Sequence, residues 1–487
     1  MKIILRLSIL SLCFVLLFCS CSQEPAEVTS ISDTTVAENL EGELDIPLTA
    51  DFGGKEYFIL SAGNVAYEDF TAEDDATLPL DVAQYKRKAL VESNYNVEIV
   101  ENAKKAYSSG EGPGFKSLYS SAISGTTEYN VGLIAGYDVS VLAYCCSLYD
   151  MNSVPGIDLT ESWWDQKANE SLAINDLVFF TTGDFTLSDN DAAYVIMFNK
   201  KLLNDYGLDD PYEMVYNNEW TLENFGKLCK TVTEDTNNDS IMDENDRYGL
   251  LVWVDSLLGM VNAAGQRCCE IDENGKIVLT LYNETTLDAV DRFLAIALDK
   301  QYALQYQSIH NTTEFEQQLW SGEHGLFWTT YMGNVPRFRE MESDFGLLPY
   351  PKLTATQDNY YCTVTPFNSQ FVCVPLMQED PQFTGIITEA LAYYGQRDVL
   401  PAYYDVNLKG MVSRDEESSD MLDIIFDNLV YDIGFLYQIG PYNKNFNYMV
   451  SGSQSNFPNL YESLRPVAES QLKTVNDGYA KAVEIWK

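Results

Sequence analysis

The sequence predicts an α/β fold with mainly parallel sheets. Short apolar segments typical of strands, 57–60, 97–100 and 131–135, alternate with longer amphipathic segments, 80–93 and 115–123, typical of helices. Such alternation is characteristic of βαβ units, in which helices cover a parallel sheet. With 487 residues, 46% of them hydrophobic, the chain is long enough for two or three domains with their own cores.

Later segments carry clearer helix signals. Apolar residues recur every three or four positions through 284–300, as on one face of a helix. Asp380 and Pro381 suit the N-cap and the first position of another helix, which we expect to end at Gly395. The last thirty residues have a similar apolar spacing, and we expect a pair of helices packed on the body.

The charge of the chain excludes one class of partner. There are 30 Lys and Arg against 73 Asp and Glu, a formal net charge of −43. Nucleic acid binding needs clustered Lys and Arg, so we expect no nucleic acid partner. With only two histidines, His310 and His324, the sequence argues against a His-rich zinc centre or a His-based triad. We expect no cofactor for activity.

The N-terminus predicts export. Residues 1–20 combine basic residues with an apolar run that is too short to span a bilayer but suits a signal peptide. Segment 17–21 resembles a bacterial lipobox, although Phe18 is bulky where a small residue is usual, and Cys21 is the expected lipidation site. Secretion without a lipid is the alternative.

Residues 21–50 are acidic, contain no Lys or Arg, and predict a flexible stalk. No further apolar run of spanning length follows. We therefore expect the body to lie on the outer face of the bacterial cytoplasmic membrane, attached through a lipid anchor only.

The cysteines after Cys21 do not suggest a disulfide framework. Seven of the ten remain after Cys13, Cys19 and Cys21 are set aside, which is an odd number with two vicinal pairs. Most suit buried positions as small apolar side chains. A bridge between Cys362 and Cys373 stays open.

Segment 235–246 has the spacing of a calcium loop. Oxygen-bearing groups stand at loop positions 1, 3, 5, 7, 9 and 12, namely Asp235, Asn237, Asp239, the carbonyl of Ile241, Asp243 and Asp246. Ser240 stands where Gly is usual, and Asp246 is shorter than the usual Glu. The prediction is a structural Ca²⁺, and a solvated acidic loop is the alternative.

Aromatic residues beside turns suggest a carbohydrate ligand. Trp328 and Tyr331 lie in one such segment, and Trp163-Trp164 in another. Sugars offer apolar C–H faces and hydroxyl rims, so aromatic platforms beside Asp, Asn and Gln suit them. Any one of these aromatic side chains could instead belong to the core.

The chain contains Phe198-Asn199-Lys200, then Tyr206-Gly207-Leu208, then Trp220-Thr221. With two later segments, these motifs resemble family 1 extracellular solute-binding proteins, the receptors of bacterial ABC importers for sugars and oligosaccharides. In that family a strand ends in Phe/Tyr-Asn-Lys, a short helix follows, and Trp-Thr caps the next helix. The segments with these features are 198–203, 206–208 and 220–225, and 320–333 and 344–351 extend the resemblance.

The resemblance implies the type II periplasmic-binding architecture, with two α/β lobes and a ligand cleft between them. The first lobe would comprise 50–185 and 349–400, and the second 188–347 and 401–487. The crossings would fall near 181–189, near 347–352 and after Gly395.

The implied function is capture of a carbohydrate, an oligosaccharide by expectation, by a monomer that delivers it to the permease subunits of an ABC importer, without catalysis. The expected ligand contacts are Asn64, Tyr137, Asp138 and Asp184 from the first lobe and its crossing, and Trp328, Tyr331 and Tyr431 from the second. Two alternatives stay open: a surface glycoside hydrolase, and a lipoprotein for adhesion or signalling that has no transport role.

Overall fold

The computed structural model describes residues 44–65, 68–106, 108–409, 416–454 and 456–487. The predicted signal peptide, Cys21 and the stalk as far as residue 43 lie outside the described residues.

The last residues assigned to the stalk are packed on the body. Leu44, Ile46 and Phe52 lie against an apolar cluster of the first sheet. The hydroxyl of Tyr95 donates to the carbonyl oxygen of Pro47 at 2.8 Å. The folded body therefore extends several residues N-terminal to residue 50, because alternate side chains here are apolar enough to be buried.

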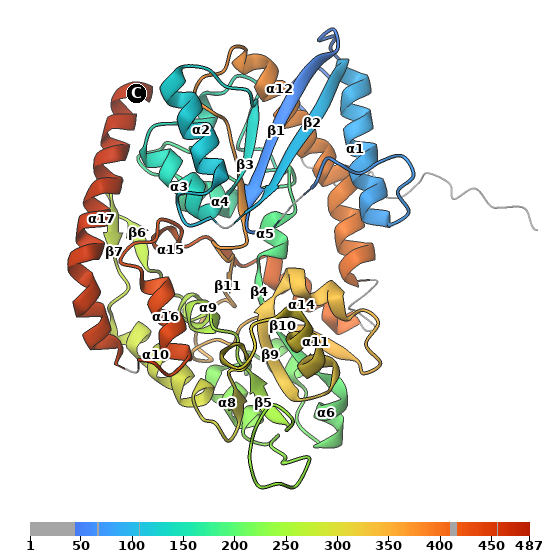
Figure 1. Ribbon diagram of the computed structural model, residues 1–487, viewed down its shortest axis with the longest axis vertical. Helices are drawn as coiled ribbons and strands as arrows, with labels where there is room; N and C mark the ends of the chain where they lie inside the picture. Colours follow the sequence, from blue (N-terminus) through green and yellow to red (C-terminus); the bar gives the residue numbers. More distant parts are fainter. Residues whose placement is uncertain (1–43, 66–67, 107, 410–415, 455) are drawn as a thin grey trace, which may run out of the picture. The chain divides into compact units, whose positions relative to one another are not determined.

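Four strands form the first sheet, in the order β12-β3-β1-β2 (Figure 1). Their bounds are β1 Lys55–Gly63, β2 Val97–Lys105, β3 Val131–Ala135 and β12 Gln370–Cys373. β1 is parallel to both β2 and β3, whereas β12 is antiparallel to β3. Every residue of β3 is buried, as expected of a strand with both faces covered.

Helices cover both faces of this sheet. They are α1 Pro79–Tyr95, α2 Pro113–Ser124, α3 Gly136–Tyr144 and α12 Pro381–Tyr394. Successive residues of β1 face opposite ways. Ile59 belongs to the same apolar cluster as Val91 of α1, and Leu60 to the same cluster as Leu118 of α2. The predicted strand–helix alternation of this region is confirmed.

Five strands form the second sheet, in the order β10-β4-β9-β5-β8. Their bounds are β4 Tyr194–Asn199, β5 Tyr248–Leu251, β8 Ala303–Leu304, β9 Gly325–Tyr331 and β10 Phe345–Leu348. β5 is parallel to β8 and β9, while β4 is antiparallel to both β9 and β10. This sheet is mixed.

The other strands form two small ribbons, β6 Cys269–Ile271 with β7 Ile277–Leu279 and β11 Cys362–Thr363 with β13 Leu429–Val430. The remaining described helices are α4 Gln166–Leu172, α5 Ser188–Asp191, α6 Lys200–Asp205, α7 Pro211–Tyr216, α8 Leu222–Cys229, α9 Ser256–Ala263, α10 Glu284–Ala297, α11 Thr313–Ser321, α14 Glu416–Phe426, α15 Ile433–Leu436, α16 Tyr442–Val450 and α17 Phe457–Trp486. Shorter or irregular helical turns are η1 Met151–Ser153, η2 Tyr306–Ser308, η3 Met332–Phe338, η4 Gly395–Val399 and η5 Ala402–Lys409.

Side-chain caps start the helices where the sequence predicts them. Asn199 Oδ1 accepts from the amide of Leu202 at 3.0 Å and begins α6 directly after β4. Asp380 Oδ1 accepts from the amide of Phe383 at 3.1 Å and begins α12. Each cap satisfies an amide that has no partner within its helix.

Three segments, 181–193, 362–369 and 429–432, connect the two sheets, and we call them the crossing segments. They are bridged to β12 and to one another: Thr181 pairs with Val372, Ala193 pairs with Val364, and β11 pairs with β13. A ligand-driven motion of one sheet against the other would therefore have to bend this region.

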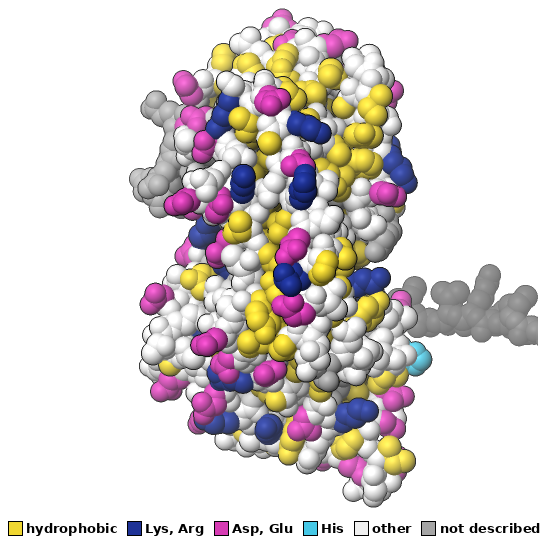
Figure 2. Space-filling model, turned by 90° about the vertical axis from the view of Figure 1, so that its left-hand side faces the viewer, with side chains coloured by type: hydrophobic (Ala, Val, Ile, Leu, Met, Phe, Trp, Pro, Cys, Tyr) yellow, Lys and Arg dark blue, Asp and Glu magenta, His cyan; other side chains and the backbone are white. Residues whose placement is uncertain are grey.

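The C-terminal region is one helix, so the expected pair of helices is wrong. α17 runs unbroken for 30 residues, with Pro466 inside it, and contacts both α3 and β7 (Figure 1). Its exposed face carries alternating charges, and Arg465 pairs with Glu469 at 3.0 Å (Figure 2). Burial of the apolar face and these pairs outweigh the single backbone hydrogen bond that Pro466 removes.

In the described part of the chain, no helix combines the length and the apolar composition that crossing a membrane requires. The seven described cysteines are free thiols, so Cys362 and Cys373 do not bridge: they lie in β11 and β12, on different sheets.

Candidate functional site

The carboxyl ends of the parallel strands bring a set of polar and aromatic side chains together. Asn64 follows β1 and Tyr137 follows β3, while Trp253 follows β5 and Tyr331 ends β9. Ligands of α/β proteins bind outside the carboxyl ends of the strands. These four residues therefore mark the candidate site.

Hydrogen bonds join the strand ends of the first sheet to the segment 433–450. Asn443 Nδ2 of α16 donates to the hydroxyl of Tyr137 at 2.8 Å. Ser140 Oγ of α3 donates to the carbonyl oxygen of Leu436 at 3.1 Å. α16 in turn packs on α9, which directly follows β5 of the second sheet. The ends of both sheets thus meet around α16.

An aromatic group lines this region, consisting of Tyr137, Tyr194, Trp253, Tyr331 and Phe367. The ring centroid of Trp253 lies 4.8 Å from that of Tyr194 and 5.5 Å from that of Tyr331. The rings of Tyr137 and Phe367 are 6.4 Å apart. Tyr331 and Phe367 are only half-buried, so part of their ring surface is available for contact with a ligand.

A polar pair, Asp255 and Asn447, lies beside the aromatic group. Asp255 stands two residues after Trp253, and Asn447 lies on α16. Burial raises the pKa of Asp255 to about 6, and a hydrogen bond from Asn447 partly offsets this rise. Oδ1 of Asn447 is buried and has no hydrogen-bond partner in the described part of the chain. A buried acceptor without a donor is unfavourable, so a ligand hydroxyl would stabilise it.

Two predicted contacts, Asn64 and Tyr137, lie at this site. Asn64 Nδ2 donates to the carbonyl oxygen of Phe367 at 2.8 Å, and its Oδ1 accepts from the amide of Ser108 at 2.9 Å. Asn64 therefore holds two loops in place. A third predicted contact, Tyr331 of the second sheet, lies beside Trp253.

Asp138 follows Tyr137 in the sequence, but its carboxylate binds backbone amides. Its Oδ1 accepts from the amides of Gly110 and Gly112, each at 3.0 Å, and its Oδ2 accepts from the amide of Phe115 at 3.3 Å. The fully buried carboxylate thus holds the chain at the start of α2. Its ligand contact stays a prediction.

Trp328 lies inside the core of the second sheet. Its side chain is 1% exposed. Its indole N–H donates to the hydroxyl of Tyr306 at 3.2 Å, and its ring lies 5.7 Å from that of Trp320 and 5.3 Å from that of Phe338. In this conformation no face is open for stacking, so that role stays a prediction.

Asp184 and Tyr431 lie in the crossing segments rather than at the strand ends. The hydroxyl of Tyr431 is 2.8 Å from Asp165 Oδ2 and 3.1 Å from Asp189 Oδ2. Burial, followed by the charge of Asp189, holds the pKa of Asp184 well above its ordinary value. Tyr431 and Asp184 therefore interact with other groups of the protein, and their contact with a ligand stays a prediction.

Trp163 and Trp164 are core residues. Their indole N–H groups donate to the two carboxylate oxygens of Glu389 on α12, at 2.9 Å and 3.0 Å. Burial raises the pKa of Glu389 to about 8, although both indole donors lower it. The packing alternative for these two side chains is the one found.

The site also contains residues that the sequence reasoning missed: Trp253, Asp255, Phe367, Asn443 and Asn447. One signal was available, since Trp253-Val-Asp255 follows a buried strand just as Tyr137-Asp138 does. Nothing in the sequence pairs Asn443 with Tyr137, because 306 positions separate them.

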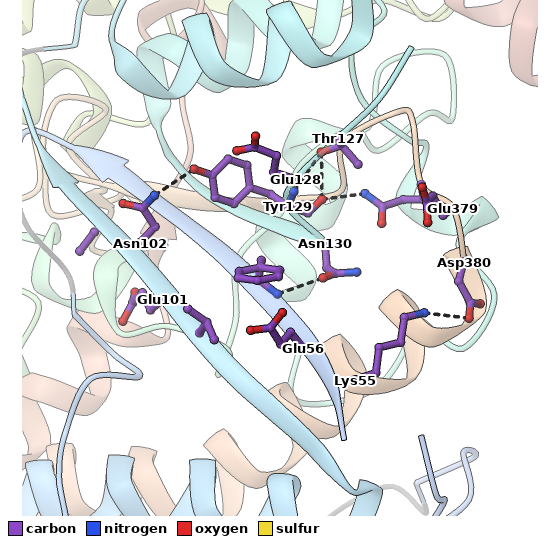
Figure 3. Close-up of a pocket in the computed structure, with 14 residues that line it drawn as sticks. Lys55, Glu56, Glu101, Asn102, Thr127, Glu128, Tyr129, Asn130, Glu379 and Asp380 are labelled. Carbon is purple, nitrogen blue, oxygen red and sulfur yellow. Dashed lines mark hydrogen bonds and ion pairs between the residues drawn. The ribbon is translucent and has the colours of Figure 1, made fainter. Parts of the chain in front are cut away.

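A large cavity lies elsewhere, beside β1 and β2 (Figure 3). Its volume is about 890 Å³, and Lys55, Phe58, Asn102 and Tyr129 are among its lining residues. Lys55 and Asn130 stand at the amino ends of β1 and β3, so much of the cavity adjoins the end of the sheet opposite the candidate site. Five of its fourteen lining residues are acidic and one is basic.

In the predicted calcium loop, the carboxylates accept hydrogen bonds from backbone amides. Asp235 Oδ2 accepts from the amide of Ser240 at 2.8 Å, and Asp246 Oδ2 from that of Asp243 at 2.9 Å. Across the described residues, no three His, Cys, Asp or Glu side chains come together as a metal site would require. The loop leads into the amino end of β5, away from the candidate site.

Comparisons with known proteins agree with this fold. No family model matches the sequence, and no curated protein does. Among solved structures, the ABC substrate-binding protein Lmo0181 from Listeria monocytogenes, in complex with cycloalternan, is 12% identical with a TM-score of 0.53. The match covers 88% of this chain and 99% of that one. The chain has the two-lobed fold of the extracellular solute-binding proteins.

Two further structures extend the comparison. A family 1 extracellular solute-binding protein from Bifidobacterium longum subsp. infantis is 12% identical, with a TM-score of 0.52 over 88% of this chain and 100% of that one. The maltose/maltodextrin-binding domain MalE from Bdellovibrio bacteriovorus, bound to maltotriose, is 12% identical, with a TM-score of 0.51 over 88% and 100%. All three are binding proteins by description.

Proposed function

We propose that this protein captures a carbohydrate between its two lobes and delivers it to an ABC importer. The observation that carries the proposal is the aromatic group at the facing strand ends, bordered by the amides of Asn443 and Asn447. Aromatic rings suit the apolar faces of a sugar, and amides suit its hydroxyls. The sugar complexes of two structures with this fold support the same ligand class.

The proposed mechanism is closure of the lobes on the ligand. In the proposal, 50–185 with 349–400 form one lobe and 188–347 with 401–487 form the other, and the chain bends between them near 181–189, near 347–352 and after Gly395. A ligand that contacts both lobes favours the closed state, because only that state gains both sets of contacts. The importer would then recognise the closed form.

The test is a panel of neutral mono- and oligosaccharides, measured by thermal shift and confirmed by isothermal titration calorimetry. A sugar that raises the melting temperature and binds one to one supports the receptor function. Analysis of the same mixtures for shortened products separates the hydrolase alternative, since a receptor leaves its ligand intact. No response to any sugar would leave the adhesion or signalling alternative.

We further propose attachment at the outer face of the cytoplasmic membrane through a lipid on Cys21. The proposal rests on the lipobox-like segment 17–21. Mass spectrometry of the mature N-terminus tests it: a lipid on Cys21 supports it, and an unmodified N-terminus elsewhere contradicts it. The matched variant is Cys21→Ser, which should be released into the medium.

A structural Ca²⁺ in the loop 235–246 is also part of the proposal, and it rests on the spacing of the oxygen groups. Binding would require carboxylates such as Asp239 to leave the amides that they now accept from. Thermal unfolding in excess Ca²⁺ and in chelator tests this. Stabilisation that is lost in Asp239→Asn but kept in Glu273→Gln, an exposed turn acid, supports the ion, and equal curves exclude it.

A further inference from the structure

We infer that Asp165, Tyr431 and Asp189 share a bound proton in the crossing segments, and that release of this proton weakens closure on the ligand. We call the three residues the crossing triad. The effect on the ligand rests on the proposed function, whereas the bound proton does not.

The geometry of the crossing triad requires a second hydrogen. The hydroxyl of Tyr431 lies within hydrogen-bond distance of both carboxylates, at 2.8 Å from Asp165 and 3.1 Å from Asp189. A phenol has one hydrogen and donates to one acceptor at a time. If both acids were ionised, one of these contacts would join two oxygens with no hydrogen between them. A proton on one carboxyl group lets that group donate to the phenol oxygen while the phenol donates to the other.

We assign the shared proton to the carboxyl group of Asp189. Asp165 is the N-cap of α4, where its Oδ1 accepts from the amide of Ala168 at 2.8 Å. Oδ1 of Asp189 is buried and has no hydrogen bond in the described part of the chain, and the nearby backbone amides of Asn190 and Asp189 only partly offset the rise in its pKa. Burial, followed by the charge of Asp165, raises the pKa of Asp189 to about 7.

Other buried acids near the crossing triad disfavour a negative charge on Asp189. Asp184, whose pKa is also raised, lies close to Asp189 in the same crossing segment. The carboxylate of Asp191 on α5 accepts from the hydroxyl of Tyr403 at 2.7 Å, and its pKa is raised to about 6 by burial. The other charged groups around this cluster are Asp69, Arg87 of α1, Glu101 of β2, and Asp398 of η4. Arg87 is the cation that offsets the charge of Asp184, and it is shared among these acids.

The crossing triad joins segments that closure has to move. Asp165 follows Trp163-Trp164, which are fixed to α12 through Glu389. Asp189 lies on α5, which leads into β4 of the second sheet, and Tyr431 follows β13. Loss of the shared proton therefore removes a hydrogen bond between the two ends of the hinge and leaves two neighbouring buried charges.

The direction of the pH effect follows from linkage. An acid whose pKa is higher in the folded protein than the ordinary value of about 3.9 binds protons preferentially in the folded state. Its contribution makes stability fall as pH rises from about 4 through about 7, and the full loss is present above pH 7. Asp189→Asn removes this contribution, and its amide N–H still donates to Tyr431.

The first experiment measures thermal unfolding without ligand between about pH 5 and pH 9, in wild type, Asp189→Asn and the exposed control Asp209→Asn. We expect the melting temperature of Asp189→Asn to fall less with pH than that of wild type, and Asp209→Asn to follow wild type. Equal pH dependence in all three overturns the bound proton. If Asp189→Asn does not fold, infrared spectroscopy of wild type against Tyr431→Phe decides: a protonated carboxyl band that responds to removal of the phenol supports the triad, and no such band overturns it.

The second experiment measures the affinity of wild type for a sugar found in the panel, at about pH 6 and pH 8. We expect a severalfold weaker affinity at the higher pH, and a smaller change in Asp189→Asn. Equal changes in both proteins overturn the link to closure. If no sugar binds, the proposed function fails, while the unfolding and infrared measurements still decide the bound proton.

Discussion

The hydroxyl of Tyr137 accepts a hydrogen bond from Asn443 Nδ2 at 2.8 Å, and this contact joins the end of β3 to α16. One partner directly follows a strand of the first sheet, and the other lies on a helix that packs on α9, after β5 of the second sheet. It is therefore a direct link across the candidate site.

Replacing Asn443 by Ala should weaken ligand binding. The variant loses the hydrogen bond that joins Tyr137 to α16 at the candidate site, at a cost of about 1 kcal/mol, or roughly fivefold in affinity. Calorimetric titration with a sugar from the panel measures it. The control is Lys444→Ala, an exposed neighbour on the same helix. Equal affinity in both variants would show that the link across the site plays no part in capture.

Trp253 and Trp328 should respond differently to truncation. Trp253 is also buried, at 8% exposed, so Trp253→Ala should lower stability as well. We expect it in addition to lower carbohydrate affinity by about 1–3 kcal/mol, because the indole belongs to the aromatic group at the strand ends. Trp328→Ala should instead lower the free energy of unfolding by about 3–5 kcal/mol, because its ring is buried in the core. Urea unfolding and titration on each variant separate the two effects. A loss of affinity in a stable Trp328→Ala would restore its predicted stacking role.

Glu389 should be a large contributor to the stability of the first sheet. Glu389→Ala leaves the indole N–H groups of Trp163 and Trp164 buried and unpaired, at a cost of about 2–4 kcal/mol in the free energy of unfolding. Urea denaturation measures this against the exposed control Glu379→Ala, for which we expect a change within about 0.5 kcal/mol. Similar values for both variants would contradict the role of Glu389 in holding the two indoles.

The same carboxyl group predicts a pH effect. Its pKa is raised to about 8 in the folded protein from an ordinary value of about 4.3, so the folded state holds the proton more tightly. Its contribution therefore makes stability fall as pH rises from about 4 to about 8. Unfolding curves of wild type and Glu389→Gln over this range should show a smaller fall in the variant. A parallel fall would assign the pH dependence to other groups.

We expect Asp138 to contribute mainly to the free energy of unfolding, rather than to ligand affinity. It accepts three backbone amides before and within the first turn of α2, so Asp138→Ala should cost about 2 kcal/mol or more in the free energy of unfolding. Asp138→Asn keeps one acceptor oxygen and should recover part of this loss. Chemical denaturation of both variants measures it. A stable Asp138→Ala with reduced sugar affinity would support the predicted ligand contact instead.

Local features were predictable because their causes lie within a few residues. Strand 131–135 is a short apolar run, and the helices after Asn199 and Asp380 begin at side chains that accept amides three positions on. The α/β alternation and the caps of α6 and α12 therefore needed no tertiary information. The resemblance to solute-binding proteins rested on the same local features.

By itself, the sequence determined the α/β class, the strand ends where Asn64 and Tyr137 stand, and the net negative charge. Only the tertiary structure decided that Trp328 is buried while Trp253 lies at the strand ends, that α17 continues through Pro466, and that Asn443 meets Tyr137. The reason is physical: caps and periodicity act through neighbouring residues, whereas burial and hydrogen bonds between distant segments depend on how the whole chain packs.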